Sequence, residues 1–185
     1  MKRTLTLLGI ASLAAFTLTA CSMQDPVVYN DSIVDVLGAA DTAYGNYATY
    51  AQETSNTYVD KIEENRLNAV SAQQGYLDQL NAMSDLDGDA SLRDGAITYV
   101  TINKELLENQ EKALVDLRTE ANNTPDEEWT DAVEADFVDK QNTIYDEIDT
   151  IITAQENDFE NLQIQFAAKN GYELEETIDN SVVTE

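Results

Sequence analysis

The chain has 185 residues, of which 36 are Asp or Glu and 10 are Lys or Arg, and its formal charge at pH 7 is −26. Because a charge of this size repels nucleic acid, we expect no nucleic-acid partner. The sequence has no histidine and a single cysteine, Cys21, which excludes histidine bases, histidine metal ligands, Ser-His-Asp triads and disulfides within the chain.

The N-terminal segment has the features of a secretion signal. Lys2 and Arg3 precede a mostly apolar run over residues 4–20, which is too short for a comfortable membrane span. The run closes with Leu18-Thr19-Ala20-Cys21. This segment resembles a bacterial lipoprotein signal with its lipobox. The resemblance implies that residues 1–20 form a signal peptide and that Cys21 becomes the lipidated first residue of the mature protein.

Lipidation at Cys21 would define how the protein meets a membrane. Removal of the signal leaves 36 acids against eight bases, a formal charge of −28, so attachment must come mainly from the acyl chains. Ser22 follows Cys21 at the position where Asp would be the usual signal for retention at an inner membrane. The resemblance therefore favours the outer membrane, and it does not indicate which face of that membrane carries the protein. A lone thiol can also stay free or bridge to another chain, but its place at the end of the apolar run favours lipidation.

The first half of the mature chain predicts two helices after a short tether over residues 21–30. Asn30 or Asp31 can cap the first helix, and residues 54–57 are typical of a turn before the second. Because the helical phase continues from Ala51 to Tyr58, a single long bent helix over 31–84 is an alternative.

The second half predicts two more helices. Residues 85–90 form a loop, and Ser91 caps a third helix that ends at Asn122-Asn123. Thr124-Pro125-Asp126-Glu127 predicts the start of the last helix, with Thr124 as N-cap, Pro125 at the first helical position and Glu127 completing a capping box. Lys169-Asn170-Gly171 predicts its end. This helix would be roughly 66 Å long, so it should overrun part of the bundle, bend or carry a separate contact.

Apolar stripes at helical spacing without strand alternation indicate an all-α fold. We therefore expect an elongated up-and-down bundle of four helices over residues 31–174, followed by a disordered tail over 175–185.

The loop between the second and third helices carries part of a calcium-binding pattern. Asp85, Asp87 and Asp89 alternate as at the start of an EF-hand loop, but Ala90 and Ala96 occupy the positions of the required Gly and bidentate Glu. The pattern favours an acidic loop over a metal site, and we expect at most weak binding of a hard cation.

Other polar and aromatic residues suggest interhelical pockets less specifically. Tyr44, Tyr47, Tyr50 and Tyr58 could line a ligand groove, although such residues more often fill a core. The side chains that could form a polar pocket, or only set the helix register, are Arg66, Gln110, Gln141 and Gln155.

Three short motifs resemble those of a known group of proteins. They are Tyr29-Asn30-Asp31-Ser32-Ile33-Val34, Gly88-Asp89 with Leu92-Arg93-Asp94, and Phe166-Ala167-Ala168-Lys169-Asn170-Gly171-Tyr172. Together with the lipobox they resemble a family of helical bacterial surface lipoproteins of unassigned activity. The resemblance implies a helical fold and an envelope location, and it adds no catalytic residue.

These features lead to the expectation of a non-enzymatic envelope lipoprotein. We expect a structural or protein-interaction module that is attached to the membrane by lipid on Cys21, engages an envelope protein and needs no cofactor. The alternative is a ligand- or divalent-cation-binding helical lipoprotein. A carboxylate-based glycosidase is a third hypothesis, which requires two inward-facing carboxylates in a cleft.

Overall fold

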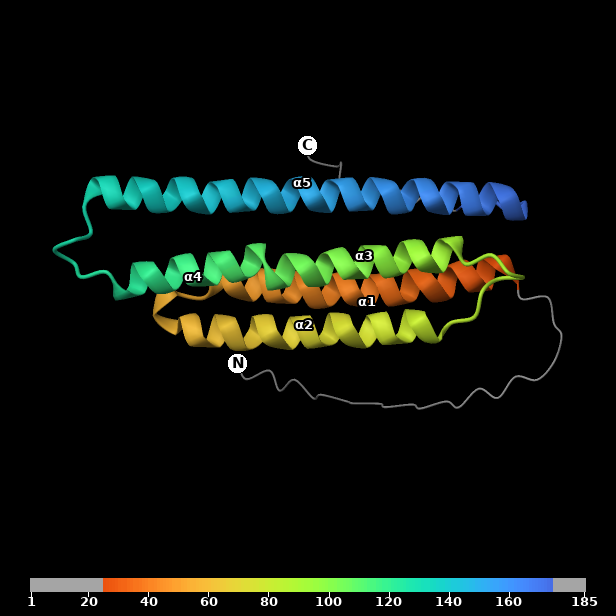
Figure 1. Cartoon of the computed structure of the whole chain (residues 1–185), viewed down its shortest axis with the longest axis horizontal. Helices are drawn as coiled ribbons and strands as arrows, with labels where there is room; N and C mark the ends of the chain where they lie inside the picture. Colours follow the sequence, from red (N-terminus) through yellow and green to blue (C-terminus); the bar gives the residue numbers. More distant parts are fainter. Residues whose placement is uncertain (1–24, 175–185) are drawn as a thin grey trace, which may run out of the picture.

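The computed structural model describes residues 25–174, and every regular element in that range is helical. The elements are α1 (Pro26–Glu53), the 3-10 turn η1 (Asn56–Tyr58), α2 (Val59–Ala82), α3 (Ser91–Glu108), α4 (Gln110–Asn123) and α5 (Asp131–Asn170). Only Asn109 separates α3 from α4, and the two run end to end as one rod (Figure 1). The bundle is thus built from four helical rods, which confirms the predicted all-α fold.

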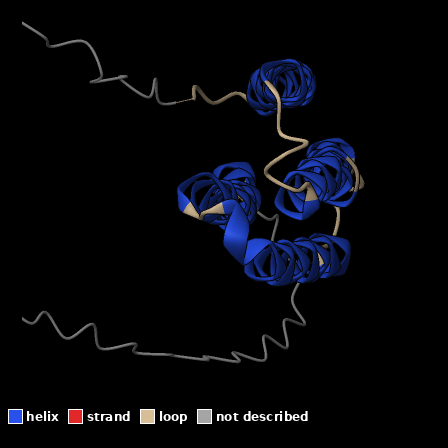
Figure 2. Cartoon of the chain, turned by 90° about the vertical axis from the view of Figure 1, so that its left-hand side faces the viewer, coloured by secondary structure: helices blue, strands red, loops and turns tan. Residues whose placement is uncertain are grey.

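The rods alternate in direction, so the chain reversals lie at two opposite ends (Figure 1). The start of α1, the loop between α2 and α3 and the end of α5 lie at one end, which we call the Pro26 end. The α1–α2 turn and residues 124–130 lie at the other, which we call the Thr130 end. Seen end-on, α5 stands to one side of the other rods (Figure 2).

Helix α1 begins earlier than the sequence predicted. Asp25 is the N-cap, and its Oδ1 accepts a hydrogen bond of 2.9 Å from the amide of Val27, with Pro26 at the first helical position. The N-cap assigned to Asn30 or Asp31 was therefore wrong, and residues 26–30 of the expected tether are helical.

A chain reversal separates α1 from α2, so the alternative of one long helix is wrong. Thr54 leaves the helical region with ψ 130°, and Ser55 caps the short turn η1. The reversal lets the apolar stripes of α1 and α2 face each other, which buries Leu37, Ala40, Leu77 and Leu80 in one cluster.

The cap of α3 also differs from the prediction. Ser91 is the first helical residue and its amide donates a 3.0 Å hydrogen bond to Oδ1 of Asp89. The carboxylate of Asp89, and not the Ser91 hydroxyl, therefore accepts a hydrogen bond from one of the free amides at the start of α3.

The predicted start of α5 was wrong, whereas its end is confirmed. Thr124 is the C-cap of α4, Pro125 opens a turn, and Thr130 caps α5 through a 3.4 Å hydrogen bond from the amide of Val133 to its Oγ1. The C-terminal cap is Gly171 at φ 73°, a left-handed conformation that glycine adopts at little cost.

Helix α5 is the longest and least buried rod. Its 40 residues extend about 60 Å, beyond the turn that joins α1 to α2 (Figure 1), which is one of the three outcomes that the sequence left open. Only five of them are buried: Ile148, Gln155, Phe159, Phe166 and Ala167. Within the described residues α5 packs on α1, α3 and α4 but not on α2.

Gly95 brings α3 and α5 close together. A Cβ atom at Gly95 would lie 2.0 Å from Cδ2 of Leu162, so the Leu162 side chain occupies the space that a larger residue would fill. Between residues 25 and 174, none of the helices combines the length and the apolar character needed to span a membrane.

Candidate functional site

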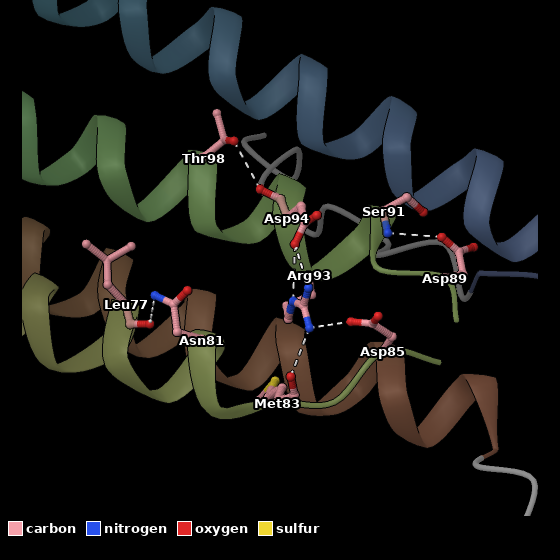
Figure 3. Close-up of polar contacts among 9 residues, drawn as sticks. All are labelled: Leu77, Asn81, Met83, Asp85, Asp89, Ser91, Arg93, Asp94 and Thr98. Atoms are coloured by element: carbon pink, nitrogen blue, oxygen red, sulfur yellow. Dashed lines mark hydrogen bonds and ion pairs between the residues drawn. The ribbon is translucent and has the colours of Figure 1, made fainter. Parts of the chain in front are cut away.

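The loop between α2 and α3 is organised by Arg93 (Figure 3). The Arg93 guanidinium forms ion pairs with Asp85 and, at 2.9 Å, with Asp94, and it donates a 3.0 Å hydrogen bond to the carbonyl oxygen of Met83. One side chain thereby joins the end of α2, the loop and the first turn of α3.

Asp89 connects the same loop to α5. Its Oδ2 lies 2.6 Å from Nζ of Lys169, while its Oδ1 caps α3 (Figure 3). The hydrogen bond from Lys169 and those from Ser91 lower the pKa of the Asp89 carboxyl to about 2. Asp89 is therefore a charged structural contact that links α3 to the last turn of α5.

The structure does not bring the three loop aspartates together around a metal. Asp85 faces Arg93 and Asp89 faces Lys169, while Asp87 sits at the tip of a tight turn with φ 51°. Among residues 25–174 no group of three or more His, Cys, Asp or Glu side chains is placed to hold a metal ion.

The four tyrosines considered as a groove separate into two pairs. Tyr47 is buried and Tyr44 is half-buried, whereas Tyr50 and Tyr58 are exposed, Tyr58 at 62%. The four polar side chains that could have formed an interhelical pocket also do not meet at one place. Arg66 is buried and pairs with Glu63 at 2.7 Å, and buried Gln155 lies on α5, while Gln110 and Gln141 are half-buried elsewhere.

A buried carboxyl group at Glu111 was missed by the sequence analysis. Its Oε1 accepts a 2.9 Å hydrogen bond from the hydroxyl of Tyr44. Burial raises the pKa of Glu111, and Tyr44 and the nearby guanidinium groups of Arg66 and Arg118 only partly offset this effect. Neither Arg is committed to Glu111, because Arg66 pairs with Glu63 and Arg118 donates to the carbonyl of Ala51.

The space beside Glu111 is too small for a substrate. Glu111, Tyr47 and Arg118 border a void of about 20 Å³, enough for a single water molecule. The cluster is therefore a structural polar centre between α1, α2 and α4. Helical spacing places Glu111 on the same face as Leu114, Val115 and Arg118, and this was the available sequence signal for its burial.

Two larger clefts flank the contact between α5 and the other rods. The α3/α5 cleft has a volume of about 320 Å³. The α1/α5 cleft, of about 250 Å³, lies on the other side of Tyr99 and Phe159, which line both. Both volumes are near the lower limit for small-molecule sites.

A chain of polar side chains lies between the two clefts. Asn103 donates to Oδ1 of Asp41 at 3.1 Å and accepts a 2.6 Å hydrogen bond from Nε2 of Gln155, and the Tyr99 hydroxyl donates to Asp41 at 3.3 Å. Oε1 of Gln155 is buried and has no hydrogen-bond partner among the described residues. This network therefore contains one unused acceptor beside the α3/α5 cleft.

The predicted lipidation site, Cys21, lies outside the described residues. Comparisons with protein-family models, with curated proteins and with solved structures found no match to this chain.

Proposed function

We propose that the protein is a non-enzymatic lipoprotein of the bacterial outer membrane that uses α5 to bind an envelope protein. Lipid on Cys21 is the proposed anchor. Helix α1 begins at Pro26, five residues further along the chain, and an extended chain of that length reaches at most about 18 Å. The Pro26 end of the bundle would therefore stay near the bilayer and the Thr130 end would point away from it.

The observation that carries the proposal is the exposed apolar surface at the Thr130 end of α5. Val133 and Val138 keep 37% and 42% of their surface exposed, and Phe137 between them is half-buried against Trp129, with ring centroids 5.9 Å apart. Val133, Phe137 and Val138 belong to the first turns of α5, at the Thr130 end. Together with the loop over residues 124–130, they lie at the end of the bundle opposite the proposed anchor, where a partner could approach them.

The anchor is tested with a Cys21→Ser variant of the full chain. In a bacterial host fed an alkyne fatty acid, the unsubstituted protein should carry the label and sediment with membranes, and the variant should do neither. A Ser22→Ala variant, which keeps the thiol, serves as the control. Equal labelling of Cys21→Ser and the unsubstituted chain would contradict lipidation at this residue.

The partner surface is tested by photo-crosslinking in cells. A benzoylphenylalanine at position 138 should give a defined adduct with an envelope protein. The same group at Val28, which is 57% exposed at the Pro26 end, is the matched control. The proposal fails if position 138 gives no adduct, or if positions 28 and 138 give the same adducts.

A further inference from the structure

We infer that the α3/α5 cleft is a binding site for a small organic cation with an apolar body, such as an arylalkylammonium ion. The inference goes beyond the proposed envelope role and does not depend on it. It rests on the size of the cleft, its apolar wall, its buried acceptor and its charge.

The wall of the cleft is apolar and partly aromatic. Tyr99 and Ile102 from α3 line the cleft with Phe159 and Leu162 from α5, and the Leu162 side chain packs against Gly95. The rings of Tyr99 and Phe159 meet edge to face with centroids 5.8 Å apart. A volume of about 320 Å³ accommodates one aromatic ring with a short chain.

The acceptor is the amide of Gln155, which lines the cleft and is only 5% exposed. Its Nε2 is held by Asn103, while its Oε1 has no partner in the described part of the chain. A buried oxygen without a hydrogen bond is unfavourable. The oxygen itself is closed off from solvent, so a ligand N–H donor in the cleft would supply the missing hydrogen bond once the Gln155 side chain turns toward it.

Charge selects a cation over an anion. Asp158 lines the cleft, and no Lys or Arg does. Carboxylates also border the adjoining α1/α5 cleft, where Asp41, Glu156 and Glu160 face no basic lining residue. An ammonium group would gain from this field, and the aromatic faces add a cation–π attraction, whereas a carboxylate ligand would be repelled.

The test uses the full-length protein and three probes that share one shape. Phenethylammonium, 2-phenylethanol and phenylacetate are titrated at pH 7 by isothermal calorimetry up to about 10 mM. We expect saturable binding of the cation to one site, at least about tenfold weaker binding of the neutral alcohol, and no binding of the anion. Added NaCl should weaken the binding of the cation, because part of the attraction is screened.

Two variants locate the site. Thr98→Trp places a large side chain in the cleft from an exposed position whose hydroxyl bonds only to its own helix, so it should abolish binding while the helical content is kept. Asp158→Asn should weaken binding of the cation severalfold. Asp149→Asn, the same change at an exposed α5 residue outside the cleft lining, is the control and should have no effect.

The inference is overturned if phenethylammonium gives no saturable heat. It is also overturned if the alcohol binds as tightly as the cation, or if folded Thr98→Trp binds the cation as tightly as the unsubstituted protein.

Discussion

At the scale of single residues, two carboxyl groups respond to the fold in opposite ways. Burial between α1, α2 and α4 raises the pKa of Glu111, whereas hydrogen bonds from Lys169 and Ser91 lower that of Asp89. Their contributions to stability should therefore change with pH in opposite directions and in different ranges.

The Glu111→Gln variant tests the buried carboxyl group. Because the folded-state pKa of Glu111 lies above its ordinary value of 4.5, this group favours folding most at low pH, and that contribution is lost as the pH rises through the folded-state pKa. Glutamine is uncharged and can still accept the hydrogen bond from Tyr44. We expect Glu111→Gln to unfold at higher urea concentration than the unsubstituted protein at pH 7, and to lose less stability as the pH rises above the ordinary pKa of 4.5. A tenfold difference in proton affinity corresponds to about 1.4 kcal/mol.

The control for this effect is Glu105→Gln, an exposed acid on the adjacent helix α3. It makes the same change in net charge without a buried group. If the pH profiles of Glu111→Gln and Glu105→Gln ran parallel, the buried carboxylate would not be the cause.

Two substitutions at Asp89 distinguish its capping contribution to stability from its ionic contribution. Asp89→Ala removes both the cap on Ser91 and the ion pair with Lys169, and should lower the free energy of unfolding by about 1 kcal/mol or somewhat more. Asp89→Asn keeps a capping oxygen and should lose less. Since the folded-state pKa is about 2 and the ordinary value is 3.8, the contribution of the charge is complete above about pH 4 and is lost as the pH falls toward 2.

Guanidinium unfolding of the two Asp89 variants at pH 3 and 6 provides the measurement. Their difference from the unsubstituted protein should shrink at the lower pH. An Asp89→Ala variant as stable as Asp89→Asn at pH 6 would show that the cap contributes nothing.

At the scale of helices, packing decided the boundaries that local signals left open. An N-cap residue followed by Pro occurs twice, at Asp25-Pro26 and at Thr124-Pro125. The first pair begins α1, but Thr124 ends α4 and the chain uses Thr130 to begin α5. Both Thr residues satisfy the capping rule, so this rule alone could not rank them. The contact between Trp129 and Phe137 at the start of α5 accompanies the second choice.

The apolar pattern predicted the number of rods because each helix buries one stripe. The motif Lys169-Asn170-Gly171 predicted the C-terminal cap of α5 because glycine tolerates a positive φ. The break at Asn109 and the surroundings of Glu111 were not predictable in the same way. The break at Asn109 leaves no distinct local pattern. Glu111 shares a helical face with Leu114 and Val115, which indicates burial but does not reveal the groups that surround its carboxyl group. The clefts beside α5 likewise depend on how α5 lies against α1 and α3. The apolar stripe of a single helix does not predict that arrangement.

Gly95 provides a test of the α3–α5 packing. A leucine at this position would enter the space of Leu162 and force the helices apart, so Gly95→Leu should lower the free energy of unfolding by about 1–3 kcal/mol. Gly75→Leu is the matched control, because a Cβ atom at Gly75 in α2 meets nothing within 4 Å. There the better helix propensity of leucine should stabilise the protein by up to about 1 kcal/mol. Urea unfolding measures both, and equal effects at the two positions would contradict the close approach at Gly95.

At the scale of the whole molecule, negative charge dominates. Seven of the eight bases between residues 25 and 174 already lie in ion pairs: Lys61, Arg66, Arg93, Lys104, Lys112, Lys140 and Lys169. These seven bases form ion pairs with only eight carboxylates, so most of the carboxylates in this part of the chain have no paired cation. Repulsion among these carboxylates should oppose the compact state in dilute buffer.

Salt should therefore stabilise the protein. We expect the melting temperature to rise as NaCl is increased from about 0.01 to 0.3 M, where the Debye length falls from about 30 Å to below 8 Å. Sucrose at equal osmolality is the control, since it changes hydration without screening charge. A melting temperature that stays constant or falls with NaCl would show that attractive ion pairs outweigh the repulsion.

The antiparallel arrangement of the rods also has a practical consequence for cell-surface display. The beginning of α1 and the end of α5 lie at the same end of the bundle (Figure 1), which is the end that the proposed anchor holds at the bilayer. A reporter domain fused where α5 ends would be delivered against the lipid headgroups. The same reporter inserted into residues 124–130 would be carried at the opposite end, about 40 Å away along the 28-residue length of α1. A difference between the two fusions in accessibility to an antibody would then show which end of the bundle points away from the membrane.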